Sequence, residues 1–217
     1  MAAMPDALRW RVLLIGGGAG VGKTTAARHL AHQLGVPCVL VDDIRMALQR
    51  VTTPAQVPAL HYFLQDTSGT SKPPVAVFAR PPEALCQALV DIGRIVTDAL
   101  IPMILHHLHV EAAGPLVLEG CDIIPDLVAG TTLGGFATRG LLRAVFVVES
   151  DAPVIGANMQ RQARGLEHCS ETARVTAAAM NWRYGQLVRA EAERCGLPVV
   201  EARPWTNLVD RLLKAAS

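Results

Sequence analysis

Short apolar runs alternate with longer amphipathic stretches along this chain, and this alternation predicts its elements. Five runs are rich in Val, Leu and Ile and lack a regular polar alternation: 11–16, 37–42, 114–120, 142–150 and 197–202. Runs of this kind are typical of strands that are covered on both faces. We therefore expect five buried strands.

The stretches between these runs favour helices. Residues 23–35 end in Gly35, a residue type that closes many helices. Further helices are expected at 82–110, 151–165, 170–195 and 206–215. In the second of these five, apolar residues step by three and four and define one face: Leu85, Leu89, Ile92, Val96, Leu100 and Met103. Pro102 is expected to kink this helix or to end its first half.

Alternating strands and helices predict an α/β fold, a three-layer sandwich in which helices cover both faces of a five-stranded parallel sheet. In this class ligands bind at the carboxyl ends of the strands. The stretches to search for function are therefore 16–25, 42–45, 119–122, 149–164 and 202–206.

The composition limits the class of protein. Apolar residues make up 51% of the 217 residues and charged residues 18%, which fits either a buried sheet or a membrane protein. No uninterrupted apolar run reaches the roughly 18 residues that a membrane span needs. Arg9 and Arg11 precede an oily run, as in a secretion signal, but that run leads into glycines and Lys23 rather than a cleavage site.

Charge and cysteine usage limit the partners. The net charge of +1 gives no long-range attraction for nucleic acid or anionic lipid. The five cysteines are scattered without a C-x-x-C pair, which is typical of reduced thiols. We expect a cytoplasmic protein that binds a small molecule and neither nucleic acid nor membrane. The oligomeric state stays open, with a homodimer as one option.

The sequence GGAGVGKT, from Gly17 to Thr24, matches the phosphate-binding pattern G-x-x-x-x-G-K-[ST] between a predicted strand and a predicted helix. Glycines let backbone N–H groups close around phosphate oxygens, and the start of a helix adds free donors. Lys23 is expected on the β- and γ-phosphates and Thr24 on Mg²⁺. The expected nucleotide contacts are Gly18, Ala19, Gly20, Val21, Gly22, Lys23, Thr24 and Thr25. This P-loop predicts a P-loop NTPase sandwich that binds ATP or GTP with Mg²⁺.

Acidic residues near the ends of the second and third runs are candidates for catalysis and metal binding. After the second run, Asp42 can accept a proton from an attacking hydroxyl and Arg45 can bind an anionic substrate; alternatively, Asp42 or Asp43 caps the next helix. Glu119 ends the third run at a Walker-B-like position, where a carboxylate can hold Mg²⁺ through water or position the acceptor. An acid at the end of an apolar strand needs a charged or metal partner.

Basic residues offer further candidates. Arg161 and Arg164 are three apart after the fourth run, where a lid can stabilise charge on the γ-phosphate; a solvated basic face is the alternative. Pro204 and Trp205 follow the last run, where a loop can contact adenine, although Trp205 can equally be core. A phosphorylated substrate can also be held by cations, some of them in the turn-rich stretch 67–82, or these can be ordinary surface residues: Arg45, Arg50, Lys72, Arg80 and Arg139.

The blocks IGGGAGVGKTTAARHLAHQLGV, DDIRMALQRV, PALHYF and VLEGCDIIPDLV resemble the 2-phosphoglycerate kinase family, P-loop kinases of the nucleoside monophosphate kinase-like group. Its D-x-I-R block matches Asp42 and Arg45, and its E-G block matches Glu119 and Gly120. The resemblance implies transfer from ATP to the free hydroxyl of 2-phosphoglycerate. This chain lacks the usual serines of that loop, and the family also resembles chloramphenicol phosphotransferase and zeta-toxin-type kinases.

We therefore expect a single kinase domain over 1–217, with an acceptor-site insertion at about 45–112 and a lid at about 151–170. Asp42, Arg45, Arg80, Glu119 and Gly120 would bind the acceptor. A neutral sugar, nucleoside or antibiotic hydroxyl is the alternative acceptor. A regulatory NTP-binding switch without an acceptor is a second alternative, although no guanine-reading N-K-x-D is present.

Overall fold

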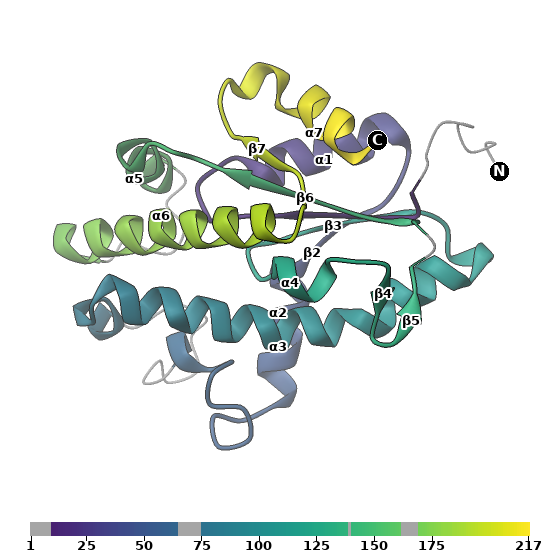
Figure 1. Ribbon diagram of the computed structural model, residues 1–217. Coiled ribbons are helices and arrows are strands. Elements are labelled where there is room, and N and C mark those ends of the chain that lie inside the picture. The colour runs from purple at the N-terminus through teal and green to yellow at the C-terminus, as the bar shows by residue number, and fades with distance from the viewer. Residues whose placement is uncertain (1–9, 65–74, 139, 162–168) are drawn as a thin grey trace.

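The computed structural model describes residues 10–64, 75–138, 140–161 and 169–217. Its centre is a parallel sheet of five strands in the order β2–β3–β1–β6–β7 (Figure 1). The strands are β1 (Val12–Gly16), β2 (Cys38–Leu40), β3 (Leu116–Glu119), β6 (Leu142–Val148) and β7 (Val199–Glu201). All five predicted strands are present, and the predicted fold class is confirmed.

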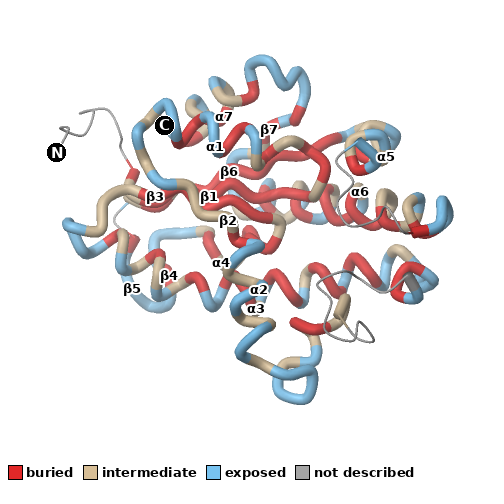
Figure 2. Tube along the Cα trace, turned by 180° about the vertical axis from the view of Figure 1, so that it is seen from behind, coloured by how far each residue is buried: buried red, intermediate tan, exposed pale blue. Residues whose placement is uncertain are grey.

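Helices cover both faces of this sheet. Helices α1 (Lys23–Leu34) and α7 (Leu208–Ala216) lie on one face, and α3 (Pro82–His109) and α6 (Glu171–Arg194) lie on the other (Figure 1). Leu13 of β1 packs in the first layer and its neighbour Leu14 in the second. Both sides of β1 are therefore apolar, and Figure 2 shows the central strands as almost continuously buried. This is why the strand runs carry no polar alternation.

The remaining elements are short or lie at the edges. The helices are α2 (Val41–Val51), α4 (Pro125–Val128) and α5 (Ala152–Arg161), with 3-10 turns at Tyr62–Leu64, Val75–Ala79, Glu111–Ala113 and Trp205–Asn207. A separate antiparallel hairpin joins β4 (Thr132–Leu133) to β5 (Phe136–Ala137). Its two-residue strands are too short for a periodicity, so the sequence did not predict it.

The second strand is shorter than predicted. Pairing of β2 with β3 ends at Leu40, and α2 begins at Val41. Val41 is fully buried over Gly120, where an added Cβ would lie 2.5 Å from the Val41 Cβ. Asp42 therefore lies in the first turn of α2, not at a strand end, and neither Asp42 nor Asp43 is its N-cap, which is Leu40.

Helix α3 carries the predicted apolar face, and Pro102 does not end it. It continues through Pro102 to His109. Five of the six predicted face residues are buried. The sixth, Met103, is only partly buried and packs against the core, and its neighbour Ile104, which was not predicted, lies in the core instead. Within the described parts of the chain, no helix is long and apolar enough to cross a membrane.

Two helices fix the loop that follows β3. The Thr97 hydroxyl of α3 is fully buried, donates to the Asp122 carbonyl at 2.6 Å, and accepts from the Ile124 N–H at 3.0 Å. From α6, the Tyr184 hydroxyl donates to the Cys121 carbonyl at 2.5 Å. Because both helices are held by the core, the loop at the carboxyl end of β3 has a defined position.

Thr97→Val should lower the free energy of unfolding by about 1–3 kcal/mol, because it leaves a buried carbonyl and a buried N–H without partners. Urea unfolding followed by circular dichroism measures this loss. Thr97→Ser keeps the hydroxyl and serves as the control. Equal stability of Thr97→Val and Thr97→Ser would contradict the role given to the two hydrogen bonds.

Candidate active site

The P-loop joins β1 to α1 and bends around an anion-binding space. Gly17, Gly20 and Gly22 have φ angles of 127°, 82° and 87°, in the left-handed region that favours glycine. A Cβ on Gly17 would lie 2.0 Å from the Val147 carbonyl oxygen, so only glycine fits there. The first turn of α1 has no acidic residue and no side-chain cap. Its N–H groups are therefore free for phosphate oxygens.

Lys23, the first residue of α1, and Glu119, the last residue of β3, form a buried ion pair. The Lys23 Nζ lies 3.4 Å from the Glu119 Oε1, and both side chains are at most 6% exposed. Lys23 also donates to the Gly18 carbonyl at 3.0 Å. The pairing follows from the sheet, because Glu119 is in register with Ile15 of β1. Glu119 thus has the charged partner that an acid at a buried strand end needs.

A cavity of about 360 Å³ adjoins this loop, a volume typical of small-molecule sites. Gly20, Gly22 and Thr25 line it from the loop and α1, Asn158 and Arg161 from α5, and Trp205 from the segment after β7. Asn158 donates to the Gly20 carbonyl at 2.8 Å and accepts from the Arg161 guanidinium at 2.7 Å. These two bonds fix Arg161 at the nucleotide side.

The segment that carries Pro204 and Trp205 is held by an ion pair that the sequence analysis missed. Glu149 follows β6, is 2% exposed, and accepts from Arg203 at 2.8 and 2.9 Å. Its hydrogen bonds and charge raise the pKa of Arg203. Trp205 lines the cavity, whereas the Pro204 carbonyl accepts from Arg211 at 2.8 Å. Glu149 could have been found in the sequence in the same way as Glu119, because both are acidic residues at the end of an apolar run.

Beside the P-loop, Arg45 bridges two carboxylates. Its Nη2 lies 3.0 Å from the Asp42 Oδ1, and its Nη1 lies 3.2 Å from the Asp122 Oδ2. Asp42 is 52% exposed and Asp122 only 1%. The structure brings Asp42 and Arg45 together, as predicted, and adds Asp122, which the sequence analysis did not single out although it stands three residues after Glu119.

Burial sets the protonation of this cluster. Burial raises the pKa of Asp122, Arg45 opposes the shift, and Asp42 adds to it. Burial also raises the pKa of the Cys121 thiol to about 12, so the thiol keeps its proton at neutral pH. Burial alone lowers the pKa of Arg45, but the carboxylates of Asp122 and Asp42 raise it. The guanidinium therefore stays charged.

Oxygen and sulfur atoms of Asp42, Cys121 and Asp122 lie within 4.8 Å of one another, the one such group of possible metal ligands among the described residues. The Arg45 charge already lies at this group and opposes a cation. Thr24 and Glu119, the predicted Mg²⁺ residues, stand instead at the start of α1 and beside Lys23.

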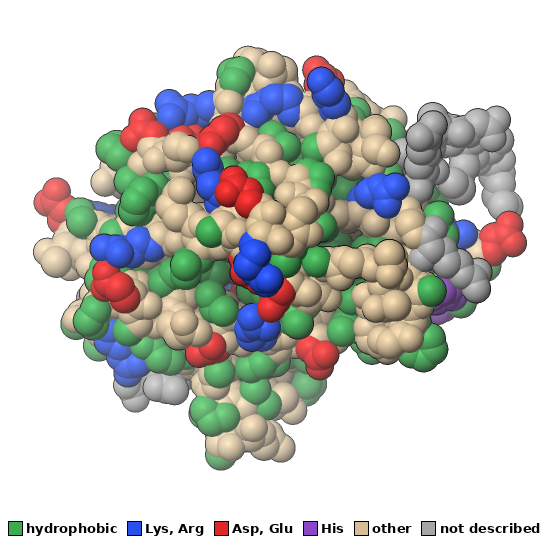
Figure 3. All heavy atoms as spheres, in the orientation of Figure 1, with side chains coloured by type: hydrophobic (Ala, Val, Ile, Leu, Met, Phe, Trp, Pro, Cys, Tyr) green, Lys and Arg blue, Asp and Glu red, His purple; other side chains and the backbone are tan. Residues whose placement is uncertain are grey.

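Other predicted residues lie elsewhere or outside the described parts. The Arg80 guanidinium lies 4.7 Å from the centre of the Tyr62 ring. Gly120 provides the space into which Val41 packs. Arg164 is outside the described residues, as are Lys72, Arg139 and much of the stretch 67–82. On the face in Figure 3, acidic and basic side chains are interspersed rather than gathered into a patch of one sign.

Comparison with known proteins supports the sequence resemblance. The chain is 32% identical to a 2-phosphoglycerate kinase of Pyrococcus horikoshii over 124 residues, which cover 54% of this chain and 37% of that protein. It is 24% identical to a 2-phosphoglycerate kinase of Methanocaldococcus jannaschii, covering 93% of this chain and 62% of that protein. The chain thus spans less than two thirds of the length of these relatives. No protein-family model matches it.

Solved kinases align with most of the chain at low similarity. A shikimate kinase from Acinetobacter baumannii in complex with shikimate covers 95% of this chain and 94% of its own, with 15% identity and a TM-score of 0.45. A gluconokinase from Sinorhizobium meliloti covers 96% and 92%, with 13% identity and the same TM-score of 0.45. Likeness at this level carries no information on the acceptor.

Lys23→Ala should weaken the binding of Mg-ATP by at least about tenfold, because it removes the cation from the phosphate cradle. It should also destabilise the fold by about 3–5 kcal/mol unless Glu119 takes up a proton, since the carboxylate loses its partner. Isothermal titration calorimetry and urea unfolding measure the two effects. Lys214→Ala, on the exposed side of α7, is the control. Unchanged Mg-ATP binding by Lys23→Ala would contradict the assignment of the cradle.

Proposed function

We propose that this chain is a Mg²⁺-ATP-dependent kinase that phosphorylates a hydroxyl of a small anionic acceptor, namely 2-phosphoglycerate or a similar phosphorylated or carboxylated metabolite. The observation that carries the proposal is that two clusters of charged side chains lie side by side at the carboxyl ends of neighbouring strands. Lys23 and Glu119 stand on the donor side, and Asp42, Arg45 and Asp122 stand on the other. The similarity to 2-phosphoglycerate kinases supports it.

On the donor side, the P-loop N–H groups and Lys23 bind the phosphate chain, and the cavity next to Trp205 and Arg161 receives the rest of the nucleotide. Mg²⁺, when bound, supplies neutralisation of the phosphate charge, and Thr24 and Glu119 are the residues that we assign to it. Both residue types provide the oxygen atoms that Mg²⁺ prefers. In this proposal Lys23 exchanges its contact with the Gly18 carbonyl for a phosphate oxygen.

On the acceptor side, Asp42 is the exposed carboxylate and can take a proton from the attacking hydroxyl. Arg45 is a charged guanidinium that is only partly exposed, which suits binding of a phosphate or carboxylate group. Tyr184 and Thr97 fix the loop next to these residues. Catalysis then consists mainly of positioning and electrostatic stabilisation, since phosphoryl transfer asks little covalent chemistry of the protein. We place this activity in the cytoplasm.

The direct test is transfer of the γ-phosphoryl group from ATP to a panel of hydroxyl compounds. We expect turnover with 2-phosphoglycerate and little with glycerol, glucose or chloramphenicol, because a neutral acceptor makes no ion pair with Arg45. Phosphorus NMR identifies the product, and ATP hydrolysis without acceptor gives the background. If neutral hydroxyl compounds react and phosphoglycerate does not, the anionic acceptor is wrong. If no compound of the panel exceeds the background, the kinase proposal loses its support.

Asp42→Asn should lower kcat by about 10²–10⁴-fold while leaving the KM for ATP nearly unchanged, since an amide cannot accept the proton. Asp43→Asn is a matched control, because Asp43 is the neighbouring exposed acid in the same turn. Steady-state kinetics of both variants decide which carboxylate acts. Equal losses in kcat and in ATP affinity for Asp42→Asn would contradict the role as base.

A further inference from the structure

Asp122 is a buried acid that the proposed chemistry does not use directly. With 1% of its surface exposed, its side chain cannot reach an acceptor in solution. Its Oδ2 makes no hydrogen bond among the described residues, although the Arg45 Nη1 lies 3.2 Å away. A buried carboxylate in this state is costly and calls for a physical role.

The geometry shows what the acid does to Arg45. Asp42 and Arg45 are three residues apart in α2. In the absence of another partner, the guanidinium can bind the Asp42 carboxylate through two hydrogen bonds, as a bidentate ion pair. In the structure only the Nη2 end of the guanidinium reaches Asp42, because the Nη1 end lies 3.2 and 3.3 Å from the two Asp122 carboxylate oxygens. Arg45 is therefore shared between the two carboxylates, with one end of its guanidinium on each.

The two carboxylates also differ in freedom. The Asp122 backbone is fixed, because Thr97 donates to its carbonyl and Gly120, two residues earlier, packs against Val41. The Asp42 side chain is half exposed on the surface of α2. Of the two carboxylates that pair with Arg45, Asp42 is therefore the one that an incoming anion can replace. An incoming phosphate or carboxylate group can replace it at Nη2 while Nη1 stays on Asp122.

From this arrangement we propose that Asp122 is a positioning residue, which holds Arg45 by one end so that an acceptor's anionic group takes the other end and releases Asp42. The inference rests on the proposed kinase function and deepens it. Acceptor binding and the release of the base Asp42 then occur together, because the acceptor's anionic group replaces Asp42 at the Arg45 Nη2. It also restricts the acceptor to a compound that carries an anion as well as the reacting hydroxyl.

The test compares the wild-type chain with Asp122→Asn. Without the buried charge Arg45 should close onto Asp42, which ties up the anion-binding group and the base together. We expect the KM and the Kd for 2-phosphoglycerate to rise by at least about tenfold and kcat to fall, with the KM for ATP unchanged within about twofold. Asp126→Asn is the matched control, because Asp126 also pairs with an arginine, Arg94, at 2.8 Å, but belongs to α4.

A double-mutant cycle separates positioning from a general structural role. If Asp122 acts through Arg45, Asp122→Asn should have no further effect on 2-phosphoglycerate binding in an Arg45→Met background. A loss of the same size in that background would overturn the inference, because it would mean that the loop is merely damaged. An unchanged or lower Kd for Asp122→Asn would also overturn it, since Asp122 would then only repel the anion.

Two further measurements keep the outcomes distinct. A crystal structure of the wild-type chain with 2-phosphoglycerate should show Nη1 still on Asp122 and Nη2 on the ligand; a ligand that displaces Asp122 would refute the proposal even if Asp122→Asn fails to fold. Calorimetric binding of 2-phosphoglycerate does not depend on turnover. If the wild-type chain binds it more tightly than Asp122→Asn but transfers nothing, the kinase function fails and the positioning role stands.

Discussion

The parallel pairing of β1 with β3 is the constraint on which the site depends. It brings the end of the strand that leads into the P-loop beside the end of the strand that carries Glu119, and so pairs Lys23 with a buried carboxylate. Without this neighbour, the loop would hold an unpaired ammonium group below the protein surface. The pairing of β2 with β3 adds the second half, because it brings the start of α2 to the same edge.

Charge is distributed differently in the two halves. At the P-loop, the donor half holds Lys23 and Glu119, both almost completely buried, which neutralise each other. The acceptor half holds one guanidinium between two carboxylates, of which one is buried and one exposed. A neutral, rigid half suits a ligand that brings its own Mg²⁺, and a half with one exchangeable anion suits a ligand that brings a negative group. The fold thus supports different recognition at two adjacent strand ends.

Local patterns predicted much of this arrangement. The P-loop could be predicted because its chemistry lies in eight consecutive residues between a strand and a helix, and the buried runs gave the five strands. The start of α2 was misplaced because Val41 continues an apolar run but packs over Gly120, far along the chain. Asp122 was missed for the same reason, since Arg45 is 77 residues away in the sequence. Contacts of this length are decided by topology, which no local pattern carries.

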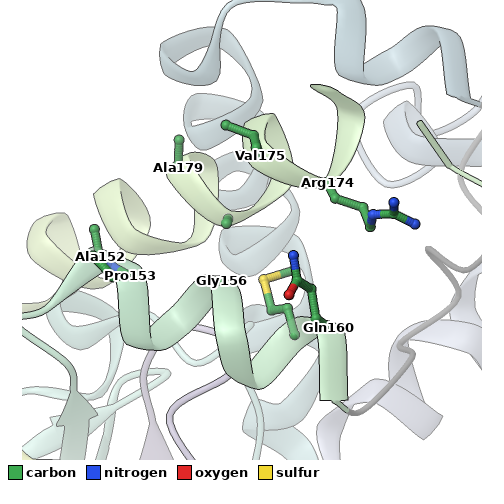
Figure 4. A pocket seen from close by; sticks show the side chains of 9 residues that line it. Ala152, Pro153, Gly156, Gln160, Arg174, Val175 and Ala179 are labelled. Carbon is green, nitrogen blue, oxygen red and sulfur yellow. The ribbon is translucent and has the colours of Figure 1, made fainter. Parts of the chain in front are cut away.

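Helix α5 packs beside α6, and a second cavity of about 270 Å³ opens between the two helices at Pro153, Gly156, Val175 and Ala179 (Figure 4). Small side chains on both helices leave this space, and Met159 adjoins both the space and Gly20 of the P-loop. Close-packed interiors resist displacement, because any shift creates clashes or voids. Between α5 and α6, Met159 is buried and its sulfur lies 3.6 Å from the Asn181 Nδ2, whereas the adjoining groove is only partly filled. The helix that carries Asn158 and Arg161 therefore meets α6 partly across a groove lined by small side chains, rather than through a fully packed contact along its whole length.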